Sequence, residues 1–296
     1  MKLSGRTPLL RARKLEKKLG VKRIYLKLEG ANPSHHKYAR IAEVLCKDAI
    51  AHHKKTLLVD GTNNYLRALE YFSIKFDLGF KIPRFKKETW KTKRFDQEKL
   101  IDARSVTLEK RLSYLGELAK ADDAYLCVEG YTHNHISLMA MEELGREITK
   151  KLPNIDAVYT DFGHGYTIAS LYHVFLNSWI EQENRFPKIY CGLNDAHVLD
   201  AENPGHDLAS YIQTHESLLY HAKQALRESY GKAIRLTEDE LKATKKLLRE
   251  TEHVKVSLQG SYALAAFIKN TALKKESEGT YIIILDDGRS LMDIEE

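Results

Sequence analysis

Short apolar runs alternate with amphipathic segments along most of the chain, and this alternation constrains the fold more than any other feature. The clearest run, Tyr281–Leu285, is apolar at every position, as expected of a strand that is buried on both faces. Further strands are predicted, with helical spacing between them, at residues 24–29, 56–60, 124–128, 156–159 and 189–193. Strands that alternate with helices favour a parallel sheet, so we predict an α/β fold.

The segments between these strands carry helical patterns. A capping box, Thr237 with Glu240 three residues later, predicts a helix that opens there and runs to about Glu252. Leucines at near-helical spacing predict a basic amphipathic helix over Leu9–Leu19, which Gly20 ends. The remaining predicted helices cover residues 40–52, 65–76, 107–121, 135–151 and 261–270.

Composition narrows the class of protein. The length of 296 residues suggests two domains or one large α/β unit. With 43% hydrophobic and 30% charged residues the chain is neither disordered nor collagenous, and its net charge of +6 is a mild surplus. No apolar run is long enough for a membrane span, and the first residues lack the apolar core of a signal peptide. Cys46, Cys127 and Cys191 are far apart and form no CxxC pair, so we expect reduced thiols in a cytoplasmic protein.

The stretch Phe80–Arg94 is locally basic and contains Phe85 and Trp90, a combination that also occurs where proteins stack on nucleic acids. Because the run is short and isolated, we interpret it as a solvated, mobile surface between two strands and do not expect nucleic acid binding. Neighbouring histidines, such as His35-His36 and His52-His53, lack the spacing and the acidic companions of a metal site, so we expect none.

Unusual residues follow the predicted strands. In a doubly wound sheet, ligands bind at the carboxyl ends of the strands, where the loops gather. Four such loops stand out: Asn32–Lys37, Gly61–Asn64, Gly163–Thr167 and Asp286–Gly288. Their coincidence predicts one ligand site.

Two of these loops suggest particular chemistry. Gly163–Thr167 follows a strand and opens a helix, so its glycines and the free N–H groups of the helix favour a phosphate group, although glycines also serve simply in tight turns. Lys37 lies at the start of a helix, flanked by His35 and His36. Partial withdrawal from water would lower the pKa of Lys37 and let it form a Schiff base, and an ordinary surface lysine is the alternative.

The sequence resembles the fold type II pyridoxal-phosphate enzymes, which include cysteine synthase, threonine synthase, serine/threonine dehydratase and the tryptophan synthase beta subunit. Thr7-Pro8-Leu9 and the run Ile24–Pro33 are similar to the opening of that family. Four further segments match family motifs in the same order, namely the substrate loop Thr62–Tyr65, the phosphate cup Gly163–Thr167, the C-terminal helices around 238–252 and 260–266, and the pyridine-nitrogen loop Asp286–Gly288.

This resemblance implies pyridoxal 5'-phosphate as the cofactor and assigns roles to residues. Asn64 would hydrogen-bond the phenolic oxygen of the cofactor, and Asp287 would keep the pyridine nitrogen protonated and strengthen the ring as an electron sink. Thr62 and Asn63 would hold the substrate carboxylate, although Asn63 and Leu66 replace family glycines and crowd that site. The phosphate would be held by Gly163, His164, Gly165, Tyr166 and Thr167.

The departure from the family is greatest at the Schiff-base lysine. The family reads Asn-Pro-x-Gly-Ser-x-Lys-Asp-Arg, and this chain reads Asn-Pro-Ser-His-His-Lys-Tyr-Ala-Arg over residues 32–40. Without a gap, Arg40 matches the family Arg but Tyr38 falls on the lysine position. A one-residue deletion before Lys37 restores the lysine and places His36 before it, as in the tryptophan synthase beta pattern, which implies that His36 contacts the cofactor. One residue rotates a helical side chain by about 100°, so the two alignments predict different chemistry.

The resemblance implies β-elimination or β-replacement on a small amino acid through an aldimine at Lys37 and an aminoacrylate. The alternative is a non-catalytic relative that binds a phosphate-bearing ligand or serves as a partner subunit, which Tyr38 and the crowded substrate loop favour. The resemblance also implies two doubly wound α/β domains, a larger one of residues 1–40 plus 153–296 and a smaller, mobile one of residues 41–152. We expect a homodimer.

Overall fold

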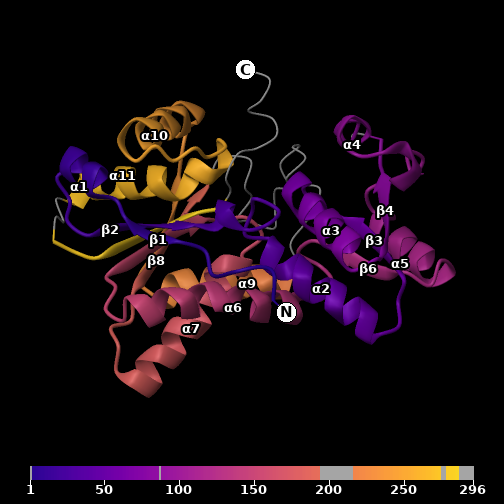
Figure 1. Ribbon diagram of the computed structural model, residues 1–296, viewed down its shortest axis with the longest axis horizontal. Helices are drawn as coiled ribbons and strands as arrows, with labels where there is room; N and C mark the ends of the chain where they lie inside the picture. Colours follow the sequence, from indigo (N-terminus) through magenta and orange to yellow (C-terminus); the bar gives the residue numbers. More distant parts are fainter. Residues whose placement is uncertain (1, 87, 194–215, 275–277, 287–296) are drawn as a thin grey trace.

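The computed structural model describes residues 2–86, 88–193, 216–274 and 278–286. Within these ranges the strands form a larger sheet, in the order β1-β2-β10-β7-β8-β9, and a smaller sheet, in the order β5-β4-β3-β6 (Figure 1). The strands are β1 (Leu9–Arg11), β2 (Ile24–Leu28), β3 (Thr56–Asp60), β4 (Gly79–Arg84), β5 (Leu100–Asp102), β6 (Tyr125–Val128), β7 (Ala157–Asp161), β8 (Lys188–Leu193), β9 (Lys232–Arg235) and β10 (Tyr281–Leu285).

Helices connect these strands, and the predicted α/β fold is confirmed. Every described strand pair is parallel except that of β1 with β2. The helices are α1 (Arg13–Leu19), α2 (Ala39–Ala51), α3 (Asn63–Lys75), α4 (Trp90–Arg94), α5 (Arg111–Ala121), α6 (Asn134–Lys151), α7 (Tyr166–Gln182), α9 (Glu216–Glu228), α10 (Glu238–Thr251) and α11 (Tyr262–Lys274), with short 3₁₀ turns at Glu29–Ala31, Gln97–Lys99 and Gln259–Ser261.

The larger sheet is buried on both faces, which explains its continuous apolar strands. Side chains of β10 alternate between two clusters, so that Ile283 packs on one face and Ile282 and Ile284 on the other. Helices α10 and α11 cover the first face, and α6, α7 and α9 lie across the second (Figure 1). This layered arrangement leaves the carboxyl ends of the strands for the loops.

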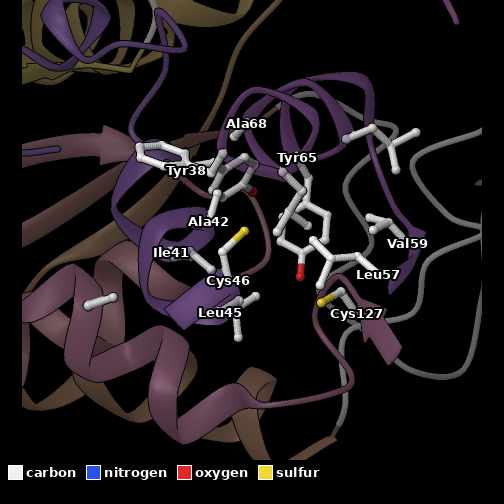
Figure 2. Close-up of a cluster of buried hydrophobic side chains, with 14 of the residues drawn as sticks. Tyr38, Ile41, Ala42, Leu45, Cys46, Leu57, Val59, Tyr65, Ala68 and Cys127 are labelled. Atoms are coloured by element: carbon white, nitrogen blue, oxygen red, sulfur yellow. The ribbon is translucent and has the colours of Figure 1, made fainter. Parts of the chain in front are cut away.

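The smaller sheet also has an apolar cluster on each face. Leu57 and Val59 of β3 pack with α2, α3 and α6 (Figure 2), and Leu58 packs on the opposite face near α5. The first of these clusters, called here the α2 cluster, extends beyond the smaller sheet to Tyr166 and Ala169 of α7 and to Leu218 of α9. Residues of the α2 cluster therefore come from elements next to both sheets.

Two sequence predictions need correction. The amphipathic helix predicted over Leu9–Leu19 begins only at Arg13, because Leu9–Arg11 pairs with β2 as an antiparallel edge strand. The described residues of the segment Phe80–Arg94 are not simply a solvated surface, because they form β4 and α4 and bury Phe85.

Lys91 explains why part of the basic segment is buried. Its side chain is 0% exposed, and Nζ lies 3.1 Å from Asp60 Oδ1 and 2.6 Å from Glu88 Oε2. Arg111 binds the same two carboxylates, at 2.6 Å and 2.7 Å, and its guanidinium lies 4.0 Å from the centre of the Phe85 ring. The positive charges of Lys91 and Arg111 neutralise buried carboxylates, so these side chains and Phe85 are not exposed for contact with a nucleic acid.

Other predictions agree with the structure. Cys46, Cys127 and Cys191 are buried and free, and Thr237 with Glu240 forms the expected capping box at the start of α10. In the described ranges, no helix combines the length and the apolar character that crossing a bilayer requires.

Candidate active site

The centre of the candidate site is the side chain of Lys37, which lies between the carboxyl ends of two neighbouring strands. Its Nζ donates hydrogen bonds to Asp161, the last residue of β7, and to Asp286 Oδ2, just after β10, the latter at 2.9 Å. The backbone N–H of Lys37 also donates to the carbonyl of Asp286, at 3.0 Å. Because the residue is only 2% exposed, the alternative of an ordinary surface lysine is wrong, and the expected withdrawal of Lys37 from water is confirmed.

The first turn of α2 fixes the position of Lys37. Arg40, three residues later, is buried, and its guanidinium binds Glu29 at 2.8 Å and Glu147 at 2.8 Å. The preceding loop contains His35 with a φ of 58°, in the left-handed region where the family pattern has Gly. His35 thus adopts, at the position of the family Gly, a conformation that glycine takes readily.

The charge state of Lys37 differs from the sequence prediction. Burial alone would lower the pKa of Lys37, but the negative charge of Asp161, with a smaller contribution from Asp286, outweighs burial and raises the pKa above its ordinary value. The lysine is therefore held as an ammonium ion in this state, and the expectation of a lowered pKa is wrong.

His36 and Tyr38, the sequence neighbours of Lys37, make hydrogen bonds with other groups. His36 Nδ1 accepts the backbone N–H of Tyr38 at 3.1 Å, and its ring lies 4.5 Å from the Tyr38 ring. Burial, together with the nearby Lys37 charge, lowers the pKa of His36 to about 3, so the imidazole is neutral. Tyr38 is buried in the α2 cluster, and its hydroxyl donates to Glu129 and also interacts electrostatically with Asp161.

The predicted phosphate loop has the geometry of an anion cradle. Gly163 and Gly165 adopt φ values of 50° and 87°, and Gly165 is the N-cap of α7, whose first N–H groups are free of helical partners. A Cβ on Gly165 would lie 2.8 Å from the Cβ of Ala222. Tyr166 and Thr167 are buried in the first turn of α7, and the Tyr166 hydroxyl donates to Asn134 at 2.7 Å.

Glu129 joins the two predicted loops and was missed by sequence reasoning. Its carboxylate accepts the Thr62 N–H at 2.6 Å and contacts His164 Nδ1 at 3.0 Å, and it also accepts the Tyr38 hydroxyl. Burial would raise the pKa of Glu129, but these partners hold it below its ordinary value. Glu129 directly follows β6, as Asp161 ends β7, so the rule that strand ends gather would have identified both.

The predicted substrate loop lies at the start of α3. Thr62 is the N-cap residue, and its N–H is already taken by Glu129. Asn64 reaches across to the 3₁₀ turn before α11, where Nδ2 donates to Gln259 Oε1 at 3.3 Å. Asn63 Oδ1 is buried and has no hydrogen-bond partner within the described residues. Asp287, assigned to the pyridine nitrogen, lies outside the described residues.

Comparisons with known proteins concern the family and the fold of the chain. The family model described as pyridoxal-phosphate dependent enzyme matches residues 1–287. No curated protein sequence matches the chain at a significant level.

Solved structures match the fold over almost the whole chain. Threonine deaminase isoform 2 from Solanum lycopersicum has a TM-score of 0.77 at 15% identity, with 99% of this chain and 82% of that chain covered. O-acetylserine dependent cystathionine beta-synthase from Helicobacter pylori has a TM-score of 0.70 at 18% identity, with 97% of this chain and 94% of that chain covered. O-ureido-L-serine synthase has a TM-score of 0.72 at 14% identity, with 97% of this chain and 90% of that chain covered.

Proposed function

The chain belongs to the family of pyridoxal-phosphate dependent enzymes, and from this premise we propose that it catalyses β-elimination or β-replacement on a small amino acid, with Lys37 as the catalytic lysine. The observation that carries the proposal is the placement of Lys37 Nζ. It lies at the carboxyl ends of β7 and β10, and the glycine loop that follows β7 begins two residues after its partner Asp161. An amine and an anion cradle are thus adjacent.

The residues present fit the cofactor. Gly165 begins a long helix with a backbone that no side chain covers, since Ala222 leaves no room for a Cβ there, and Asn63 offers a buried oxygen that lacks a donor. Residues Gly163–Thr167 would hold the phosphate, Lys37 would hold the cofactor covalently, and Asn64 would bind its phenolic oxygen. When bound, pyridoxal phosphate supplies an electron sink for negative charge at the substrate α-carbon.

The residues of the chain would act on the substrate in two ways. Lys37 Nζ, once deprotonated, takes the proton from the α-carbon as a general base. The substrate carboxylate cannot use the Thr62 N–H, because Glu129 occupies it. We therefore assign the carboxylate to the N–H groups of Asn63 and Asn64 and to the Thr62 hydroxyl, at the positive end of the α3 dipole.

The cofactor assignment is tested by chemical trapping. The protein is incubated with pyridoxal phosphate, reduced with borohydride and digested, and the labelled peptide is identified by mass spectrometry. We expect a yellow protein whose label maps to Lys37. Lys37→Ala should remove both the colour and the label, and Lys47→Ala, which changes an exposed lysine of α2, should keep them. A label on another lysine would refute the role of Lys37.

The reaction is tested with β-substituted serine derivatives. Two of the similar structures are named for O-acetylserine and O-ureido-L-serine, which makes such compounds the first substrates to assay. Elimination should release an oxoacid, and an added thiol should divert the product to a substituted amino acid. Product formation that persists in Lys37→Ala would contradict the proposed mechanism.

A non-catalytic relative is the second candidate. The two carboxylates on Lys37 and the occupied Thr62 N–H favour it, because both oppose the usual chemistry of the site. This candidate predicts a protein that binds the cofactor phosphate and stays colourless at every pH.

The proposal also covers the location of the protein, its oligomeric state and its division into domains. We propose a cytoplasmic homodimer, with a larger domain of residues 1–40 and 153–296 and a smaller domain of residues 41–152. The two sheets support this division, because β3 to β6 all fall within the smaller range. Sedimentation analysis of the purified protein measures the oligomeric state.

A further inference from the structure

Lys37 faces two carboxyl groups from neighbouring strands, and this arrangement has a consequence for its reactivity. Nζ donates to Asp161 Oδ1 and to Asp286 Oδ2, and the side chain is almost fully enclosed. The other titratable side chains that interact with this trio include His36, Tyr38 and Cys191, and all three are neutral, because burial lowers the pKa of His36 and raises the pKa of Tyr38 and of Cys191. One cation is therefore shared by two acids.

The two acids have different surroundings. The side chain of Asp161 is 21% exposed, and its Oδ1 also lies 3.3 Å from the Thr160 hydroxyl. The side chain of Asp286 is 5% exposed, and its Oδ1 has no hydrogen-bond partner among the described residues. An ionised carboxylate that lacks water and donors is costly, and two buried carboxylates beside one cation are not both ionised.

The directions of the pKa shifts agree with these surroundings. The Lys37 ammonium holds the pKa of Asp161 below its ordinary value, although burial opposes this. Burial, and then the charge of Asp161, raise the pKa of Asp286 well above its ordinary value.

We propose that Asp161 is the positioning residue that holds Lys37 as an ammonium ion, while Asp286 remains a neutral carboxylic acid. This inference rests on the proposed function, in which Lys37 binds the cofactor. Before Nζ can attack a carbonyl, its ammonium must release one proton to solvent and become a neutral amine. The negative charge of Asp161 opposes that release, so Asp161 sets the pH at which Lys37 becomes a nucleophile.

The test measures the reactivity of Lys37 in the cofactor-free protein. Formaldehyde with cyanoborohydride methylates neutral amines, and peptide mapping by mass spectrometry gives the rate at each lysine as a function of pH. We expect Asp161→Asn to speed methylation of Lys37 by at least about tenfold at neutral pH, which corresponds to about one unit in the pKa of Lys37. Asp286→Asn, which replaces a neutral group by another, should change the rate much less.

Controls separate charge from folding. Asp161→Glu should restore the slow rate, and Asp156→Asn makes the same chemical change just before the other end of β7 and should leave Lys37 slow. Lys27 and Lys91 are buried, so both are internal standards that stay slow only while the variant is folded.

The possible outcomes are distinct. Equal effects of Asp161→Asn and Asp286→Asn, or a larger effect of the latter, would overturn the inference, as would an unchanged rate in both. If a variant fails to fold, the wild-type protein gives a second measurement: Lys37 should become reactive at a higher pH than a free lysine side chain, and a pH profile equal to that of free lysine would also overturn the inference. These readouts need no cofactor, so they are independent of the trapping experiment on Lys37.

Discussion

Replacing Gly165 by Ala tests how closely the phosphate loop is packed. Gly165 begins α7 with a φ of 87°, in the left-handed region that a residue with a Cβ rarely adopts. The added Cβ would also lie 2.8 Å from the Cβ of Ala222, a fully buried residue of α9. Neither atom belongs to a flexible side chain, so the backbone of α7 or α9 has to shift. The substitution thus combines a conformational cost with a packing cost.

The structure separates these two costs. The left-handed conformation costs a residue with a Cβ about 1–2 kcal/mol, and overpacking costs about 1–3 kcal/mol, so we expect Gly165→Ala to lower the free energy of unfolding by about 2–5 kcal/mol. Gly20 has a φ of 68° and no atom within 4 Å of its added Cβ. Gly20→Ala should therefore carry the conformational cost alone, about 1–2 kcal/mol.

The assay is urea unfolding of the cofactor-free variants, followed by far-ultraviolet circular dichroism. Gly116→Ala provides the opposite control, because Gly116 lies inside α5 with open space around it and Ala should stabilise that helix by about 0.5–1 kcal/mol. The reasoning is refuted if Gly165→Ala and Gly20→Ala have the same effect, because the contact with Ala222 would then carry no cost.

Three further predictions concern stability. The folded protein lowers the pKa of His36 from 6.5 to about 3, so only the unfolded chain takes up that proton as the pH falls from 6.5 towards 3. The free energy of unfolding should therefore fall in this pH range by up to about 1.4 kcal/mol per pH unit. In urea unfolding at several pH values, His36→Asn should remove this contribution to the pH dependence, and His52→Asn, which changes an exposed histidine, should leave it in place. Lys91→Met leaves Asp60 and Glu88 with Arg111 alone and should cost about 3–5 kcal/mol, whereas a loss under 1 kcal/mol would mean that the network is not needed. Thr237→Ala removes the capping box of α10 and should cost about 1 kcal/mol by thermal unfolding, and an unchanged melting temperature would contradict the cap.

The buried strands could be predicted because their sequence signal is local. Thr56–Asp60 and Tyr281–Leu285 match β3 and β10 residue for residue, since a central strand needs apolar side chains on both faces. β1 could not be predicted in this way. Leu9 and Leu10 also fit a helical pattern, and only pairing with Lys27 and Leu26 of β2 makes this segment a strand.

The site was predicted in part for a similar reason. The loops that hold Lys37 and Gly165 carry recognisable local motifs, so their positions follow from the sequence. The charge state of Lys37 depends on Asp161 and Asp286, which are more than 100 residues away along the chain. The burial of Lys91 could not be predicted for the same reason, because a basic segment is expected to be solvated unless the buried carboxylates that it neutralises are known.

The α2 cluster has a consequence for any attempt to express the smaller half alone. A fragment of residues 41–152 would contain β3 to β6 but would lack Tyr38, Tyr166, Ala169 and Leu218, which complete the cluster from outside that range. The excised fragment would expose an apolar face to water and would tend to aggregate. A laboratory chimera that exchanges this segment should therefore also carry α7 and α9 from the same parent.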